Sequence, residues 1–281
     1  MINGSTKIFG IIGFSLEHSL SPLMHNYVFN YMKLNCVYVP FPVKRDLKKA
    51  IIGLHELDVK GVNITIPYKE EVINYIDELD EKSRKIGSVN TIKFTDKKIG
   101  YNTDGIGAIK ALKDGNIEVK GKKVMLLGAG GAARSIAFQL VFEGCSDLLI
   151  LNRTKERGDK LAREIMEKAD FSCKSMKLDQ KILSEYIHDV DILINSTSLG
   201  MYPNVNESPV PKEILHDELV VFDIVYNPLK TKLLKEAEEM GAKTIDGLGM
   251  LVHQGAESLR IWLDIDPPID LMKKVLLSHL K

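Results

Sequence analysis

The sequence predicts an α/β protein with mainly parallel sheets, organised in two domains. Short apolar segments that fit buried strands alternate with segments of helical periodicity along almost all of the 281 residues. Near the middle, the strand-like segment KKVMLL runs directly into the glycine-rich segment GAGGAARS, and the character of the chain changes there. The length suffices for two modest domains, and motifs place the boundaries near Asp104 and near Gly247.

The composition excludes several classes of protein. Lysine plus arginine equals aspartate plus glutamate at 38 each, so the chain lacks the basic excess typical of binding to nucleic acid or to a membrane surface. No apolar run approaches the roughly 20 residues that span a bilayer, and the first residues lack the pattern of a signal peptide. Cys36, Cys145 and Cys173 are far apart and the histidines lack ligand spacing, which predicts no disulfide and no metal site. We therefore expect a soluble cytoplasmic protein with reduced thiols.

The N-terminal part of the chain predicts strands joined by helices. Strands are expected at 7–13, 37–43 and 61–66, followed by a hairpin of 91–94 and 99–101. One helix begins at Ser21-Pro22, with serine as the N-cap and proline at the first helical position. A second helix is expected from Pro67 to about Leu79, because its apolar residues recur on one face.

The central part repeats the alternation with more apolar strands. Strands are expected at 122–127, 148–151, 191–195 and 219–223. A helix follows the glycine-rich segment to about residue 143, and another covers 231–240, where Gly241 is a natural C-terminal cap.

The segment Gly128-Ala129-Gly130-Gly131-Ala132-Ala133 predicts a dinucleotide-binding turn. The first glycine permits the tight turn, and the second lets the backbone approach a pyrophosphate at the N-terminus of the helix that follows. The third position of the pattern is an alanine, which is small enough for close packing of helix and strand. A glycine-rich turn can also be only a turn, but the strand before it and the helix after it favour the nucleotide site.

The end of the next strand indicates which dinucleotide binds. An NAD-binding fold places an acidic residue there, whereas this sequence has Asn152, Arg153 and Thr154, with Arg157 one turn later. Guanidinium groups bind a 2′-phosphate through charge-assisted hydrogen bonds, whereas a carboxylate repels it. These arginines could instead be solvated at a helix start, but their place favours NADP(H).

Polar residues near the N-terminus form candidates for a substrate site. Ser19 and Ser21 stand at a predicted helix start, where an anion is favoured, although capping alone would explain Ser21. Asn63 and Thr65 alternate with apolar residues along one strand, so they point to one face, near its C-terminal end. Lys69 falls in the first turn of the expected helix, where the helix dipole favours the neutral amine and so suits proton transfer. A solvated surface lysine is the alternative.

Further candidates have equally good local explanations. Asp104 could be a catalytic acid or the cap of a helix over 105–114. Asn90 could simply stabilise a turn, and Tyr226 could be an aromatic side chain that fills space in a turn. The segment 195–201, which contains Thr197, could be a plain loop, and Gln254 could face solvent or substrate in a helix that opens at Gly247.

Taken together, the segments resemble the shikimate dehydrogenase family, in matching order and spacing along nearly the whole chain. The segments that carry the resemblance are HSLSP (18–22), NITIPYK (63–69), SVNT (88–91), NTDGIG (102–107), GAGGAAR (128–134), NRT (152–154), NSTSLGM (195–201), YNPLKT (226–231) and DGLGMLVHQGA (246–256). Departures are small: Ile64, Ile66 and Tyr68 stand where other members often have valine and phenylalanine.

The resemblance implies a fold, an activity and residue roles. The fold is a substrate domain of residues 1–104 plus 247–281, completed by C-terminal helices, a Rossmann-like NADP-binding domain of 105–246, and a cleft between the two. The activity is the NADPH-dependent reduction of 3-dehydroshikimate to shikimate in aromatic amino acid biosynthesis, by a monomer or homodimer. Lys69 and Asp104 correspond to the catalytic pair. The implied substrate-binding residues are Ser19, Ser21, Asn63, Thr65, Asn90, Tyr226 and Gln254. The implied cofactor-binding residues are Gly128, Ala129, Gly130, Gly131, Ala132, Asn152, Arg153, Thr154, Arg157, Thr197 and Gly247.

Three alternatives stay open at this point. A quinate/shikimate dehydrogenase would use a broader range of substrates and often NAD, which the two arginines disfavour. A methylenetetrahydrofolate dehydrogenase has a related architecture, but the two-serine segment and NTDG disfavour it. A non-catalytic NADP-sensing module would bind the cofactor without turnover, which the presence of both Lys69 and Asp104 disfavours.

Overall fold

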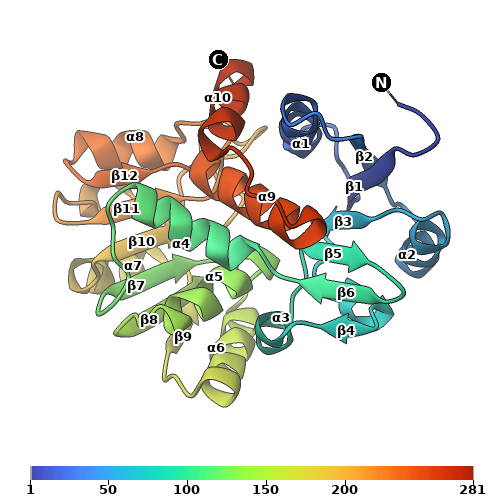
Figure 1. Ribbon diagram of the computed structural model, residues 1–281. Helices are drawn as coiled ribbons and strands as arrows, with labels where there is room; N and C mark the ends of the chain where they lie inside the picture. The colour runs from blue at the N-terminus through green and yellow to red at the C-terminus, as the bar shows by residue number, and fades with distance from the viewer. Residues whose placement is uncertain (1, 281) are drawn as a thin grey trace. The chain divides into compact units, whose positions relative to one another are not determined.

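The computed structural model describes residues 2–280, which divide into two compact units (Figure 1). Unit 1 contains the chain up to Thr103 together with Gln254–His279, and unit 2 contains Asp104–His253. Each unit is built on one six-stranded sheet. No helix in the part of the chain that is described is long and apolar enough to cross a membrane.

The sheet of unit 1 is mixed, with strand order β2-β1-β3-β5-β6-β4. Strands β1, β2 and β3 are parallel, β5 is antiparallel to both β3 and β6, and β4 is parallel to β6. The strand bounds are β1 Lys7–Gly13, β2 Cys36–Pro42, β3 Gly61–Ile64, β4 Glu78–Leu79, β5 Thr91–Phe94 and β6 Lys98–Tyr101.

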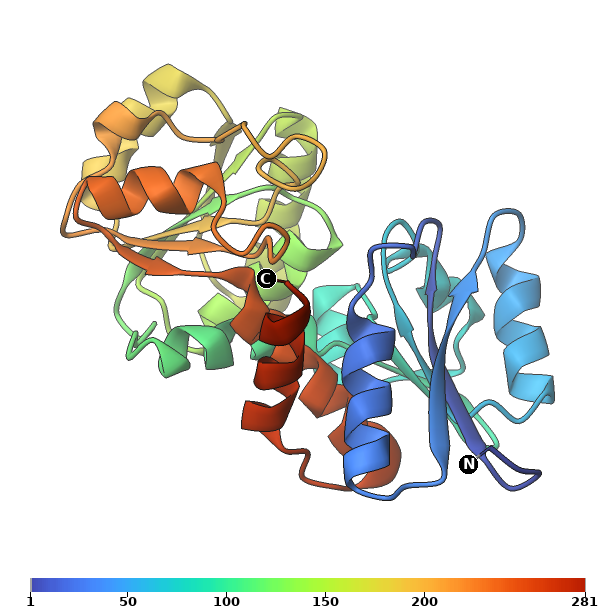
Figure 2. The same ribbon diagram turned by 90° about the horizontal axis from the view of Figure 1, so that it is seen from above.

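The helices of unit 1 are α1 (Ser21–Tyr31), α2 (Leu47–Glu56), α3 (Glu81–Ile86) and α10 (Ile269–His279). One part of the core lies under α2, where its buried apolar face meets β3 and β5. Helix α10 packs beside α1 although the two are far apart in the sequence (Figure 2). The C-terminal segment thus completes the N-terminal unit.

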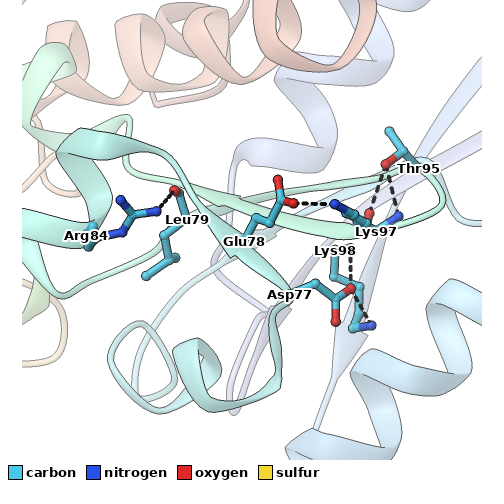
Figure 3. Close-up of polar contacts among 7 residues, drawn as sticks. All are labelled: Asp77, Glu78, Leu79, Arg84, Thr95, Lys97 and Lys98. Carbon is cyan, nitrogen blue, oxygen red and sulfur yellow. Dashed lines mark hydrogen bonds and ion pairs between the residues drawn. The ribbon is translucent and has the colours of Figure 1, made fainter.

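The short strand β4 at the edge of this sheet is fastened by charged side chains (Figure 3). Asp77 accepts hydrogen bonds from both the backbone N–H and the ammonium group of Lys98, each at 2.7 Å, and Glu78 pairs with Lys97. The guanidinium of Arg84 donates to the carbonyl of Leu79 at 3.1 Å. Exposed charges on an edge strand also disfavour pairing with a further chain.

The sheet of unit 2 is wholly parallel, with strand order β12-β11-β10-β7-β8-β9. This is the doubly wound dinucleotide-binding order, in which the strand order reverses between β7 and β10. The strands are β7 Lys123–Leu127, β8 Asp147–Asn152, β9 Lys174–Lys177, β10 Ile192–Asn195, β11 Val220–Asp223 and β12 Lys243–Ile245. The helices are α4 Asp104–Asp114, α5 Gly131–Phe142, α6 Lys155–Ala169, α7 Gln180–Tyr186 and α8 Lys232–Glu239, and α9 Gly247–Leu263 continues into unit 1.

Both faces of this parallel sheet are buried, as its continuous apolar strands predict. Met125 and Leu127 of β7 belong to a cluster that α7 and α8 cover. Val124 and Leu126 alternate with them, so they point to the opposite face, and both are at most 1% exposed.

Most predicted elements are confirmed, but the segment 67–79 is not a helix. It contains a turn, a short 3-10 helix over Glu71–Tyr75 and strand β4. The N–H of Asp77 donates to Lys98, and that of Asp80 to Gly100, so pairing with β6 overrides the helical periodicity. The third strand also ends early, at Ile64, and Ile66 is 75% exposed.

Two predicted helix starts are shifted by one residue. Leu20 is the N-cap of α1 and makes no side-chain cap, so Ser21 is the first helical residue rather than the cap. Asp104 likewise lies inside the first turn of α4, where a negative charge interacts favourably with the helix dipole.

Candidate active site

The glycine-rich turn in unit 2 joins β7 to α5 and has the form that a phosphate requires. Gly128 has φ +111°, and a Cβ there would lie 2.7 Å from Oγ of Ser196, so only glycine fits. A Cβ on Gly130 would meet no described protein atom within 4 Å, and no side chain caps α5. The backbone N–H groups at the start of α5 can therefore approach an anion, whereas the side chain of Ala133 is buried.

The segment after β8 presents cationic side chains. Nδ2 of Asn152 donates to the carbonyl of Thr154 at 2.7 Å, which shapes the turn into α6. Arg153 and Arg157 are exposed, and within residues 2–280 neither forms an ion pair with a carboxylate. Two exposed guanidinium groups at the end of β8 suit a phosphate ligand.

The loops after β10 and β11 meet at a buried carboxylate. Asp223 is 0% exposed and accepts from Asn195 Nδ2 at 3.0 Å, Val225 N at 3.1 Å and Thr231 Oγ1 at 2.7 Å. Oδ1 of Asn195 in turn accepts from the N–H and the hydroxyl of Thr197, at 3.0 and 2.7 Å. Burial outweighs these hydrogen bonds and raises the pKa of Asp223 to about 6.

Gly247 and Tyr226 lie beside this carboxylate cluster. A Cβ on Gly247 would lie 2.2 Å from the carbonyl oxygen of Ile224, so the close approach of the chain requires glycine. The N–H of Gly247 donates to Val225 at 3.3 Å. Burial raises the pKa of Tyr226, so its phenol stays protonated and can donate a hydrogen bond.

In unit 1, Ser19 and Ser21 lie on either side of the start of α1. Ser19 is partly exposed, and its N–H donates to Leu16 at 3.0 Å. Ser21 is only 6% exposed.

Lys69 lies in the turn after β3, and its carbonyl accepts from the N–H of Val89 at 2.8 Å. Asn90, which follows Val89 in the sequence, is 2% exposed, and its Oδ1 accepts from the N–H of Thr103 at 2.8 Å. Val89 thus holds the backbone of Lys69, and the neighbouring Asn90 holds the backbone of Thr103, which precedes Asp104. Because Lys69 is not in a helix, the dipole argument for its neutral amine does not apply.

Asn90 also brings a second candidate close. Its Nδ2 lies 2.8 Å from Oγ1 of Thr103 and 3.5 Å from Oε1 of Gln254. Asn90 and Gln254 are separated by more than half of the chain, and only the fold brings them together.

Asn63 differs from its expected placement, because its amide faces the interior of unit 1. The side chain is on β3 and 5% exposed. Its Oδ1 accepts from the hydroxyl of Tyr38 at 2.8 Å, and its Nδ2 lies 3.2 Å from the carbonyl of Asn90 and 2.9 Å from Oγ of Ser258. Thr65, past the strand end, is partly exposed.

Comparisons with known proteins agree along the whole chain. The profile of the shikimate dehydrogenase substrate binding domain matches residues 11–92, that of shikimate / quinate 5-dehydrogenase matches 110–250, and that of the shikimate 5′-dehydrogenase C-terminal domain matches 247–277. The chain belongs to the shikimate dehydrogenase family.

Curated shikimate dehydrogenases (NADP(+)) are similar over their full length. That of Methanocaldococcus jannaschii is 47% identical, covering 100% of this chain and 99% of the relative. That of Pyrococcus furiosus is 49% identical with the same coverage. A crystal structure of a shikimate dehydrogenase in complex with NADP+ matches with a TM-score of 0.95 at 46% identity, covering 100% of this chain and 98% of the other. A second, from Thermus thermophilus in complex with NADP(H) and shikimate, matches with a TM-score of 0.88 at 32% identity, covering 98% of this chain and 100% of the other.

Sequence reasoning missed the residues that support the site of this shikimate dehydrogenase family member. Asn26 accepts from the N–H of Tyr38 at 2.9 Å and donates to its carbonyl at 2.7 Å, and the ring of His25 stacks on the tyrosine with centroids 4.4 Å apart. Ser258 and Asp223 are buried polar residues whose hydrogen-bond partners lie on distant segments of the chain. Such residues at strand and helix positions expected to be apolar are the signal that could have identified them.

Proposed function

We propose that this chain catalyses the reversible reduction of 3-dehydroshikimate to shikimate with NADPH, in aromatic amino acid biosynthesis. The observation that carries the proposal is the arrangement around the adjacent residues Val89 and Asn90. Val89 holds the backbone of Lys69, and Asn90 holds the backbone of Thr103, which precedes Asp104. The side chain of Asn90 also lies beside that of Gln254. The names of the full-length relatives support the same reaction. The proposed substrate and catalytic domain is 1–104 plus 247–281, and the proposed NADP-binding domain is 105–246.

The residues of unit 2 fit NADP. The open space at Gly130 and the uncapped start of α5 suit the pyrophosphate, and the exposed Arg153 and Arg157 suit the 2′-phosphate. The proposed cofactor contacts are Gly128, Ala129, Gly130, Gly131, Ala132, Asn152, Arg153, Thr154, Arg157, Thr197 and Gly247. When bound, the cofactor supplies the hydride for the C3 carbonyl carbon.

Lys69 and Asp104 are the proposed catalytic pair. The ammonium group of Lys69 hydrogen-bonds the C3 oxygen and gives up a proton to it as negative charge develops. The carboxylate of Asp104 orients the lysine and an adjacent substrate hydroxyl, and stabilises the ammonium form before transfer. In the reverse direction the neutral amine takes the proton back.

The substrate-binding residues act by orientation. The hydroxyls of Ser19 and Ser21 are proposed to bind the substrate carboxylate. The side chains of Thr65, Asn90, Tyr226 and Gln254 are proposed to bind the ring hydroxyls and the carboxylate. Asn63, whose amide is used inside unit 1, is proposed to act by holding Tyr38 and the backbone of Asn90.

A crossed assay tests the proposal. Purified protein is incubated with shikimate or quinate and with NADP⁺ or NAD⁺, and reduced cofactor is followed by absorbance. Efficient turnover is expected only for shikimate with NADP⁺. Comparable rates with quinate would favour the broader quinate/shikimate enzyme, and cofactor binding without turnover would favour a sensing module.

The proposed cellular setting is the cytoplasm. The three cysteines are free, and burial raises the pKa of Cys145 to about 12 and that of Cys173 to about 11. Such thiols are unreactive and need no oxidising compartment. We propose a monomer or homodimer without a nucleic acid or membrane partner.

A further inference from the structure

Asp223 is a buried carboxylate for which the proposed chemistry has no direct use. It ends strand β11, is 0% exposed, and lies between the loop after β10 and the segment that leads to α8. A charge in such a place is costly unless hydrogen bonds compensate it. Its function must therefore be sought in what those hydrogen bonds hold.

The carboxylate is surrounded by donors from three segments. Oδ1 accepts from Nδ2 of Asn195 and from the N–H of Val225, and Oδ2 accepts from the hydroxyl of Thr231. The orientation of the Asn195 amide is fixed, because its oxygen accepts from the backbone N–H of Thr197. Its Nδ2 must then face Asp223. The amide of Asn195, the N–H of Val225 and the hydroxyl of Thr231 therefore all donate to the carboxylate.

Two of these donors, Asn195 and Val225, lead to candidate binding residues. Asn195 connects Asp223 to both the N–H and the hydroxyl of Thr197. Val225 precedes Tyr226, and its carbonyl accepts from the N–H of Gly247. One carboxylate thus organises three segments that the proposed function places against cofactor and substrate.

We propose that Asp223 is a positioning residue, whose ionised carboxylate holds the segments that carry Thr197, Tyr226 and Gly247 in their binding arrangement. This inference rests on the proposed function, because it assigns those three residues to ligand binding. Hydrogen bonds to an ionised acceptor are roughly twice as strong as neutral ones. Protonation of Asp223 therefore loosens all three segments together.

The surroundings of Asp223 set the pH at which its carboxylate is protonated. Strands β10 and β12 and helix α8 pack against β11, and the groups that shift the pKa of Asp223 are Thr231, Val225 and Asn195, with no charged side chain among them. Burial dominates and raises the pKa to about 6. The positioning effect should consequently weaken as the pH falls through this value.

Asp223→Asn tests the proposal, because an asparagine imitates the protonated acid. Its oxygen can accept from Asn195 and Val225, and its NH₂ can donate to Thr231. The readout is kcat/KM for NADP⁺ and for shikimate from pH 5 to 8, which reports groups of the free enzyme. The activity of the wild type relative to D223N is expected to fall about 3- to 30-fold as the pH drops past 6, where the two should become equal.

Controls separate the protonation of Asp223 from that of other groups that titrate in the same pH range. The 2′-phosphate of NADP⁺ titrates near pH 6 in every variant, so the ratio of wild type to D223N at each pH is the decisive quantity. Asp217→Asn changes an exposed acid before the same strand and should retain the wild-type profile. Thr231→Val removes one hydrogen bond to the charged form, so its acid limb should move to higher pH by about one unit.

An acid limb of the same midpoint and depth in D223N would overturn the proposal, as would a Thr231→Val profile identical to that of wild type. If D223N folds poorly, Thr231→Val alone decides, since it leaves the carboxylate in place. No turnover of shikimate by the wild type at any pH would defeat the proposed function instead. The positioning of the cofactor segments would then be tested by the pH dependence of NADP⁺ binding to wild type and D223N.

Discussion

The side-chain oxygen of Asn90 accepts a hydrogen bond from the backbone N–H of Thr103 at 2.8 Å, immediately before Asp104. Asn90→Ala should therefore lower kcat/KM for shikimate by about tenfold or more, because the backbone before the candidate acid loses its tether and the substrate loses a proposed binding group. Steady-state kinetics measure this change. Thr103→Ala retains the N–H and should have a smaller effect. Equal losses in the two variants would show that the tether does not matter.

Lys69→Ala should lower kcat by about 10²–10⁴, the usual contribution of a general acid, while the fold is retained. Turnover is followed by absorbance and the fold by circular dichroism. Lys85→Ala, which removes an exposed partner of Glu81, is the matched control and should stay near wild type. Unchanged turnover in Lys69→Ala would remove lysine from the mechanism.

Arg153→Ala should raise KM for NADPH by about 10- to 100-fold and leave KM for NADH nearly unchanged, because charge-assisted bonds to the 2′-phosphate are lost. Arg163→Ala changes an exposed arginine in the middle of α6 and should change neither constant. The two cofactors are compared under the same conditions. A similar loss with both would contradict the phosphate assignment.

Tyr38→Phe should lower the free energy of unfolding by about 1–3 kcal/mol, because Oδ1 of Asn63 would stay buried without its donor. Urea denaturation measures the change. Tyr75→Phe removes a long hydrogen bond to Glu71 at the surface and should cost much less. Equal stabilities of the two variants would argue against the buried network.

We expect the buried His25 to lower the free energy of unfolding in acid. Its ring is 0% exposed, neither nitrogen has a hydrogen-bond partner among the described residues, and burial lowers its pKa to about 3. The unfolded chain binds more protons at this residue between about pH 6.5 and 3, so stability is complete above pH 6.5 and falls as the pH drops. The loss from this residue should be about 2 kcal/mol at pH 5.

His25→Leu removes that contribution, so its unfolding free energy should depend less steeply on pH than that of the wild type between pH 7 and 5. Parallel urea titrations measure both slopes. Identical slopes for wild type and His25→Leu would contradict the prediction.

Local sequence determined those features that depend on neighbouring residues. The strand, glycine turn and helix around Gly128 were predictable because a positive φ and a short connection require glycine. The hairpin at 91–101 and the helix end at Gly241 have similar local causes.

Only the tertiary structure decided what depends on distant residues. The segment 67–79 has helical periodicity but pairs with β6, and Asn63 alternates as a surface residue would but faces Tyr38 and Ser258. The physical reason is that a buried polar group must find partners wherever the fold supplies them, and those partners lie up to 195 positions away in the sequence. Periodicity identifies which face of an element is buried, whereas hydrogen-bond partners across the core are chosen only when the chain packs.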